Sequence, residues 1–261
     1  MPTPKISIIT ICYNSVSTIS QAIKSVVSQN YPQLELIVID GGSTDGTLDL
    51  LKTYDNEINI LVSESDNGIS DAFNKGISRA SGELIGILNS DDVMLPGALQ
   101  AIADAYHPDI DVYRGNIQLW NSQTNFKVSE KPSMKFPKVP VIIHVCHGGT
   151  FITRKAYQKY GNYDTHMKFM MDLDLLTRLY QAGATFKYVD AEIEAFRLGG
   201  ITSTPLKKKK EEMAYFVRKN GGTRLHFFLY YTALQFQDLA KHLLNIFGED
   251  FKRKLRYKSR K

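Results

Sequence analysis

The sequence predicts an α/β protein with a mostly parallel sheet, helices on both faces of that sheet, and a basic, amphipathic helical tail at the C-terminus. Three observations lead to this prediction. Short apolar runs that suit buried strands alternate with stretches of helical spacing through the first 110 residues. Acidic and turn residues directly follow several of these runs. Finally, residues 206–261 hold 15 Lys/Arg and 5 Asp/Glu, whereas residues 1–205 hold 17 and 22.

The first 110 residues contain four strand–helix pairs. Each strand-like run is too short for a helix and is bounded by turn residues, and each helical stretch carries apolar residues at spacings of three and four. This alternation is typical of a Rossmann-like sheet. We predict strands at 6–11, 34–39, 58–62 and 84–88, and helices at 18–29, 47–54, 69–80 and 96–106.

The pattern changes after residue 110. Hairpin-like strands are followed by a loop that contains three prolines, and then by one more strand–helix–strand unit. We predict strands at 112–116, 126–128, 150–153 and 186–189, a loop at 131–140 and a helix at 172–182. The predicted organisation is a body of residues 1–205, with a change of pattern after residue 110, and a tail of residues 206–261.

Composition narrows the class of protein. Of the 261 residues, 43% are apolar, which is enough for a sizeable core, and no run approaches the roughly 18 apolar residues that span a membrane. Cys12 and Cys146 have no zinc spacing, so free thiols in a reducing cytoplasm are expected. The first residues lead straight into a strand without a signal-peptide pattern.

The run Asn89-Ser90-Asp91-Asp92 ends the fourth predicted strand with two adjacent carboxylates. Ligands bind beyond the carboxyl ends of strands in open α/β sheets, and two repelling acids there favour a cation. Carboxylate oxygens together with phosphates suit Mg²⁺ or Mn²⁺. A solvated turn that starts the next helix is the alternative.

Three polar residues fall at other strand ends. Tyr13 and Asn14 follow the first strand and Asp40 ends the second, so the fold would bring them to the same edge as Asp91. Tyr13 suits stacking on a base, and Asp40 suits accepting hydrogen bonds from a base or a ribose. Neither a GxGxxG nor a GxxxxGK[ST] motif is present, which argues against dinucleotide and P-loop folds. A simple turn or cap remains the alternative for each residue.

A second acidic cluster, Met171-Asp172-Leu173-Asp174-Leu175, begins a predicted helix. Asp172 in the first turn could face a cleft and act as a general base, whereas Asp174, two residues on, would point elsewhere. An N-terminal helix cap is the competing interpretation of Asp172.

Together these motifs resemble the family 2 glycosyltransferases, inverting enzymes with the GT-A fold. The block Glu35–Thr47 is similar to the family's "E-x-I-V-V-D-D-G-S-T-D-G-T" signature. The run Asp66–Gly76 resembles the "D-x-G-I-Y-D-A-M-N-K-G" run of a bacterial branch that builds surface polysaccharides. Further matching segments are 6–14, 89–92 at the DxD position, 171–175 at the "E-D-x-D-L" position, and 196–203 at the "F-x-x-G-G-I-S" position.

The resemblance implies a nucleotide-binding half (1–110), an acceptor-binding half (111–205) and a role for individual residues. Asp91 would bind Mg²⁺ or Mn²⁺, and Asp172 would be the catalytic base. His147 and Arg197 would contact the diphosphate or the acceptor, although a buried His147 that is satisfied by its neighbours is an open alternative. The residues implied at the donor are Tyr13, Asn14, Asp40, Asp66, Asp71 and Asn89.

The implied reaction transfers a sugar from a nucleotide-diphospho-sugar, most often a UDP-sugar, to a hydroxyl of a glycan or lipid-linked acceptor. The sequence departs from the family pattern at four positions: Asn89 replaces the first Asp of DxD, Gly41 the second Asp of D-D-G-S, Ile11 a frequent Thr, and Met171 a Glu. Two alternatives remain. One is a sugar-nucleotide nucleotidyltransferase, and the other is a non-catalytic partner subunit.

The tail carries one strongly apolar side over residues 223–247, flanked by basic residues at 207–210 and 252–261. Such a helix suits the surface of an anionic membrane, which would place the protein at the inner face of the cell membrane. A helix packed on the body or in a homodimer is the alternative. Because the charge is not interleaved on a recognition face, no nucleic-acid partner is expected.

Overall fold

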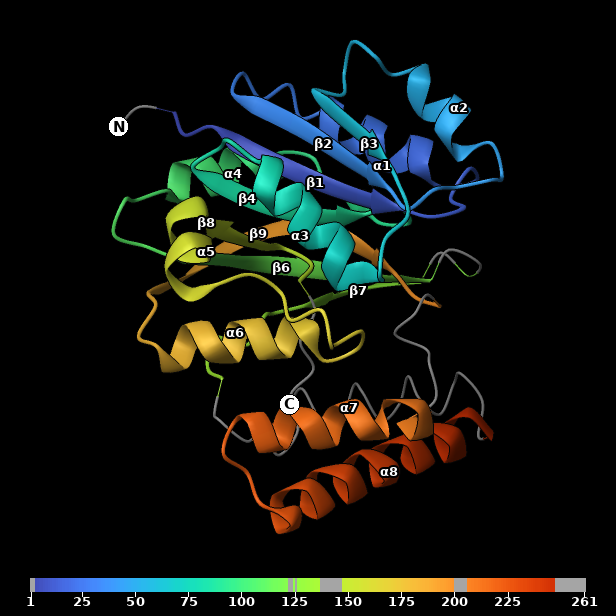
Figure 1. The fold of residues 1–261 in the computed structure, drawn as a ribbon, viewed down its shortest axis with the longest axis vertical. Helices are drawn as coiled ribbons and strands as arrows, with labels where there is room; N and C mark the ends of the chain where they lie inside the picture. Colours follow the sequence, from blue (N-terminus) through green and yellow to red (C-terminus); the bar gives the residue numbers. More distant parts are fainter. Residues whose placement is uncertain (1–2, 122–123, 125, 137–146, 200–205, 247–261) are drawn as a thin grey trace. The chain divides into compact units, whose positions relative to one another are not determined.

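The computed structural model describes residues 3–121, 124, 126–136, 147–199 and 206–246 (Figure 1). The described strands form one sheet in the order β3-β2-β1-β4-β8-β6-β9-β5, with β7 paired to β6. The strands are β1 (Ile6–Cys12), β2 (Leu34–Asp40), β3 (Ile60–Ser63), β4 (Leu84–Asn89), β5 (Val93–Met94), β6 (Val112–Asn121), β7 (Phe126–Glu130), β8 (Thr150–Thr153) and β9 (Phe186–Arg197). The helices are α1 (Ile19–Val27), α2 (Thr47–Lys52), α3 (Ile69–Arg79), α4 (Ala98–Ala105), α5 (Arg154–Tyr160), α6 (Met171–Gln181), α7 (Leu206–Lys219) and α8 (Arg224–Ile246).

The first four strands are parallel, and β1, β2 and β4 are buried on both faces of the sheet. Side chains alternate between faces along each strand. Ile6 and Ile8 of β1 pack in a core with α1 and α4. Ile9 points the other way, toward α3, where a β-carbon at Gly76 would lie 2.4 Å from its Cγ2 atom. The predicted layering, with helices on both faces, is therefore confirmed.

The second half of the sheet mixes parallel and antiparallel pairs. β8 runs antiparallel to β4 and to β6, while β9 runs parallel to β6 and antiparallel to β5. The α/β fold class is confirmed, with the parallel strands concentrated in the first half. Three described elements were not predicted: the two-residue strand β5, the short helix α5 and the continuation of β9 from residue 190 to 197.

The chain divides into two compact units, one of residues 1–137 and 145–203 and the other of residues 138–144 and 204–261. In the second unit α7 packs on α8, and α7 was not predicted as a separate helix. No described helix is long and apolar enough to cross a membrane. The expectations for Cys146, residues 137–140, residues 200–203 and the basic end at 252–261 lie outside the described residues.

Candidate active site

The carboxyl ends of β1, β2 and β4 meet at one edge of the sheet. The strand register pairs Cys12 with Asp40, and Ile11 with Asn89. Tyr13, Asp40 and the acid loop of residues 89–92 therefore start from neighbouring positions, as the sequence predicts.

Asp40 organises the loop that follows β2. Its carboxylate is completely buried and accepts hydrogen bonds from the Ser43 amide at 3.1 Å and from the Ser63 hydroxyl at 2.6 Å. The Ser43 hydroxyl and, at 3.7 Å, the Cys12 thiol also donate to it. Burial and the charge of Asp40 raise the pKa of that thiol, which remains protonated. In this structure, Asp40 fixes the conformation of the loop after β2.

Asn14 joins the loops after β1 and β2. Its backbone is left-handed (φ 49°), and its amide N–H donates to the Ser43 hydroxyl at 2.8 Å. Its side-chain oxygen accepts from the Thr44 amide at 2.9 Å. The neighbouring Tyr13 ring is 63% exposed, so an aromatic face stands beside a fixed loop and is accessible for stacking.

Asp66 lies directly against Gly41. A β-carbon at position 41 would be 2.5 Å from Oδ2 of Asp66 and 3.5 Å from Cδ2 of Tyr13. The other oxygen of Asp66 accepts from the Gly68 amide at 2.8 Å. Asp66 therefore occupies the space into which a side chain at position 41 would extend. Asp71, in contrast, bonds locally: it accepts from the Asn67 amide and lies 3.5 Å from Lys75.

The two adjacent acids after β4 have different surroundings. Asp92 is 1% exposed and accepts from the Asn89 side chain at 3.0 Å and from the Arg197 amide at 2.7 Å. Burial and the neighbouring Asp91 raise the pKa of Asp92 to about 6. Asp91 is only half-buried, and no described residue donates a hydrogen bond to its carboxylate. Asp91 is therefore the acid of this loop that is available to a ligand.

Arg197 holds the acid loop in place. Its Nε atom donates to the Asp91 carbonyl oxygen at 2.8 Å and its Nη2 atom to Gln21 at 2.9 Å. The guanidinium lies 4.4 Å from the centre of the Trp120 ring, within cation–π range. Gln21 and Trp120 were not singled out in the sequence, because each carries no motif and becomes relevant only through this contact.

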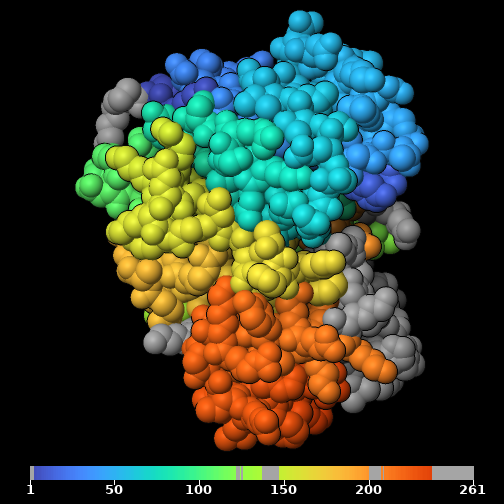
Figure 2. Space-filling view, viewed as in Figure 1, coloured from blue at the N-terminus to red at the C-terminus, as the bar shows by residue number. Residues whose placement is uncertain are grey.

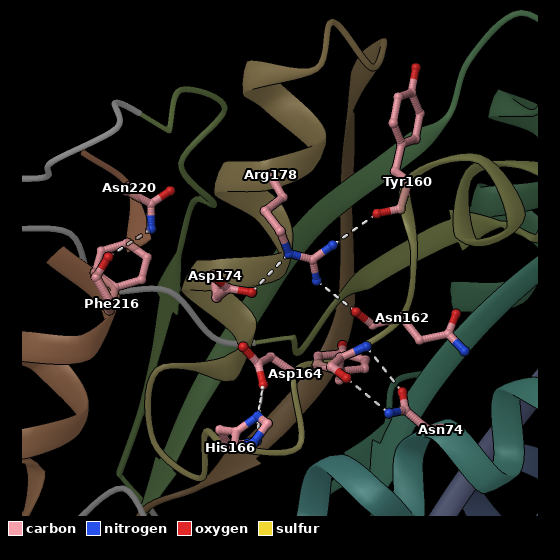
Figure 3. Close-up of polar contacts among 10 residues, drawn as sticks. Asn74, Tyr160, Asn162, Asp164, His166, Asp174, Arg178, Phe216 and Asn220 are labelled. Atoms are coloured by element: carbon pink, nitrogen blue, oxygen red, sulfur yellow. Dashed lines mark hydrogen bonds and ion pairs between the residues drawn. The ribbon is translucent and has the colours of Figure 1, made fainter. Parts of the chain in front are cut away.

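Asp172 lies in the first turn of α6, as predicted, and pairs with His147. Its Oδ2 atom accepts from the His147 amide at 3.1 Å and lies 3.2 Å from Nδ1 of the His147 ring. Its Oδ1 atom is buried and has no hydrogen-bond partner among the described residues. Asp174, on the same helix, is fully buried and pairs with Arg178 at 2.8 Å (Figure 3).

The segment that leads into α6 is fixed to α3. Asn74 exchanges two hydrogen bonds with the Tyr163 backbone, at 2.9 and 3.0 Å. Ser70 donates to the Met167 carbonyl oxygen at 2.6 Å. Figure 2 shows the two segments, which are distant in sequence, side by side on one face of the molecule. The segment before Asp172 is therefore attached to α3, which packs on β1 and β2.

His147 interacts electrostatically with both the acid loop and Asp172. Burial opposes a charge on this ring, but Asp172, Glu194 and Asp92 outweigh that effect and raise the pKa of His147 to about 9. The ring is therefore a cation at neutral pH, with acids from three separate elements around it. The predicted metal side and the predicted base thus border one buried cluster.

Glu194 of β9 belongs to the same cluster and was missed in the sequence. It is 2% exposed, and burial followed by the charge of Asp92 raises the pKa of Glu194 to about 8. The signal that could have found it is an acid inside the apolar run Ile193-Glu194-Ala195-Phe196.

The donor set at the acid loop fits a divalent cation that is completed by phosphate oxygens. Within the described residues there is no cluster of three or more His, Cys, Asp or Glu side chains that could enclose a metal ion. A single available carboxylate at Asp91, however, matches the manner in which Mg²⁺ binds through one or two carboxylates and the phosphates of its ligand.

Comparison with known proteins gives the family. A model described as "Glycosyl transferase family 2" matches residues 7–161, more than half of the chain. The chain belongs to glycosyl transferase family 2. It is 28% identical over 202 residues to an uncharacterized glycosyltransferase of Rickettsia prowazekii, covering 73% of this chain and about 62% of the length of that relative. It is 39% identical over 92 residues to the putative teichuronic acid biosynthesis glycosyltransferase TuaG of Bacillus subtilis, covering 34% of this chain and 36% of TuaG.

Solved glycosyltransferases confirm the GT-A-type fold. S. aureus TarS in complex with UDP-GlcNAc matches with a TM-score of 0.64 at 19% identity, over 82% of this chain and 65% of that one. The mannosyltransferase PcManGT from Pyrobaculum calidifontis, in complex with GDP-Man and Mn²⁺, matches with a TM-score of 0.66 at 15% identity, over 96% and 82% of the two chains.

Proposed function

We propose that this family 2 glycosyltransferase moves a sugar, with inversion, from a UDP-sugar to a hydroxyl group of a glycan or lipid-linked acceptor in surface polysaccharide synthesis. One observation carries the proposal. The acid loop after β4, through Asp92, and the first turn of α6, through Asp172, both act on the buried ring of His147. A carboxylate available to a metal and a carboxylate available as a base therefore border the same cluster.

The proposed donor site begins at Tyr13 and Asp66. The exposed Tyr13 ring would stack on the base, and Asp66, which fills the space beside Gly41, would accept hydrogen bonds from the base or the ribose. Asn14 and Asp40 would hold the loop that shapes this pocket. Asp71 would act from the start of α3. The UDP-GlcNAc bound to TarS and the teichuronic acid role named for TuaG support a UDP-sugar and a surface polymer.

At the acid loop, Asp91 would hold Mg²⁺ or Mn²⁺, with Asn89 beside it. When bound, this ion neutralises the charge that grows on the leaving diphosphate. Arg197 fixes the Asp91 backbone from behind and so sets where the carboxylate can reach. The PcManGT complex with Mn²⁺ supports a divalent ion in this fold.

Asp172 would accept the proton of the acceptor hydroxyl. The acceptor oxygen forms a bond to the anomeric carbon while the bond from that carbon to the diphosphate oxygen breaks, and the electron pair leaves with the diphosphate. A single displacement of this kind inverts the anomeric configuration. The His147 cation holds Oδ2 of Asp172 through two hydrogen bonds, which fixes the orientation of the base.

The acceptor would bind to residues 111–205, and the tail would bring the protein to the inner face of an anionic membrane. Four exposed side chains of α8, Leu225, Phe228, Leu229 and Phe236, have spacings that place them on one side of the helix. In the sequence, basic residues at 207–210 and 252–261 flank this helix. Co-sedimentation tests this part: the double variant Phe228→Ser plus Phe236→Ser should lose binding to phosphatidylglycerol vesicles. Unchanged binding would instead favour a tail helix that packs on the body or in a homodimer.

A donor panel with Mn²⁺ tests the reaction itself. We expect release of nucleotide diphosphate from a UDP-sugar when acceptor is present. Release of pyrophosphate would instead indicate a nucleotidyltransferase, and no release from any donor would indicate a non-catalytic subunit.

Two further experiments test the residue roles. Asp172→Asn should abolish transfer while donor binding persists, and Asp104→Asn, on the exposed side of α4, is the matched control. EDTA should stop turnover, and Mg²⁺ or Mn²⁺ should restore it. Transfer by the Asp172→Asn variant would exclude this residue as the base, and turnover in EDTA would exclude a required metal.

A further inference from the structure

The last residues of β9 lie behind the acid loop. β9 pairs with β5 directly after this loop, with Met94 opposite Glu194. Three residues further on, Arg197 donates to the Asp91 carbonyl oxygen and, through its amide, to Asp92. The position of the acid loop is therefore set by residues 194–197.

Glu194 extends from the same segment to the peptide of residues 147–149. Its Oε2 atom accepts from the Gly149 amide at 3.2 Å. Gly149 has a left-handed backbone (φ 65°), and a β-carbon there would lie 3.0 Å from the Gly115 carbonyl oxygen, so the peptide runs close to β6. Gly115 also donates to the Gly149 carbonyl oxygen at 2.9 Å. Glu194 and Gly115 thus hold this peptide from two sides.

The other end of this peptide holds the base. The amide and ring of His147 both bond to Oδ2 of Asp172. A continuous series of contacts therefore runs from Asp91, along residues 194–197, through residues 147–149, to Asp172.

We propose that Glu194 is a positioning residue that sets the base Asp172 relative to the acid loop, an inference that rests on the proposed function. Glu194 does not touch substrate, because its side chain is 2% exposed and lies within the sheet. The groups that face it are Asp92 from the loop after β4, and His147 and the Gly149 amide from the loop before β8. The burial-raised pKa of about 8 keeps the Glu194 side chain neutral at pH 7, so it acts as a hydrogen-bond acceptor without adding a third charge.

Kinetics of Glu194→Ala and Glu194→Gln in the full chain test this role. The Ala variant loses the acceptor for Gly149, and we expect kcat to fall by about tenfold or more with the donor KM within about twofold, because misplacement of a base slows the chemical step. The Gln variant keeps a neutral acceptor and should retain kcat at pH 7. Glu192→Gln, which removes an acid from the same strand where it bonds to Ser129, is the control. A wild-type kcat in Glu194→Ala, or a change confined to KM, would overturn the proposal.

Two measurements cover the remaining outcomes. If Glu194→Ala does not fold, Glu194→Met decides, because it keeps the length of the side chain and leaves the Gly149 amide without this acceptor: kcat should fall by about tenfold or more relative to Glu194→Gln, and equal kcat values in the two variants would overturn the proposal. If the wild type turns over no donor, the proposed function fails. The positioning role is then measured by NMR, where the ring nitrogens of His147 should shift in Glu194→Gln and not in Glu192→Gln. Unchanged His147 resonances would refute it independently of turnover.

Discussion

Replacing Glu194 by glutamine should flatten the pH dependence of stability near neutrality. In the folded protein the pKa of Glu194 is raised to about 8 and that of His147 to about 9, whereas in an unfolded chain these groups titrate near pH ~4.3 and ~6.5. Around pH 7 the folded state therefore holds close to two protons that the unfolded state has released. Raising the pH then favours unfolding.

The size of the effect follows from proton linkage. Each such proton changes the free energy of unfolding by about 1.4 kcal/mol per pH unit, and the His147 proton is partly retained by the unfolded chain at pH 7. The wild type should lose about 2 kcal/mol per pH unit from these two groups, and Glu194→Gln about 1 kcal/mol, because glutamine has no proton to release. Because Glu194 also helps to raise the pKa of His147, the His147 contribution falls in the same variant, which lowers the slope further in the same direction.

Urea unfolding followed by circular dichroism between pH 6.5 and 8 measures this difference. The two proteins should differ in slope while the m value stays the same, and Glu192→Gln should keep the wild-type slope. Equal slopes for the wild type and Glu194→Gln would show that Glu194 is already ionised at neutral pH, which would refute the electrostatic reasoning for the cluster.

Three other variants test separate parts of the structure. Gly41→Ala should displace Asp66 and raise the donor KM by about tenfold, because one charge-assisted hydrogen bond to the donor would be lost. An unchanged KM would show that Asp66 does not bind the donor. Gly86→Ala should destabilise the protein by about 1–3 kcal/mol in thermal unfolding, because its β-carbon would lie 2.6 Å from the buried Phe151 ring; wild-type stability would show that this ring can move. Arg178→Leu should cost about 3–5 kcal/mol because it removes the partner of a buried acid on α6, and a loss below 1 kcal/mol would contradict that pairing.

The sequence was most informative where one local pattern decides the structure. The apolar runs that became β1, β2 and β4 are buried on both faces, and their ends bring Asp40 and Asn89 to one edge. α5 was missed because Arg154–Tyr160 is short and mostly polar, and it depends on a cap from the Thr153 side chain. β9 was predicted too short although Asp190, Glu192 and Glu194 alternate with apolar residues, which is the pattern of a half-buried strand.

Candidate residues for the site could be proposed from the sequence, but the contacts that these residues make could not. Asp91 and Asp92 are equivalent in sequence, yet burial separates them, with Asp92 enclosed and Asp91 available. Arg197 was expected at the diphosphate or acceptor, and no local pattern could reveal that its guanidinium also bonds to the Asp91 carbonyl oxygen and to Gln21. Such differences depend on strands that are about 100 residues apart in the chain, so no local spacing could reveal them.

The two bonds between Asn74 and Tyr163, and the one from Ser70 to Met167, attach the segment before Asp172 to α3, about a hundred residues earlier in the chain. β7, which pairs with β6 outside the main strand order, can therefore differ between relatives without moving Asp172. A chimera made from two relatives should keep residues 147–172 together with the first 110 residues, because His147 also holds Asp172 and the Gly149 amide anchors the peptide that carries His147.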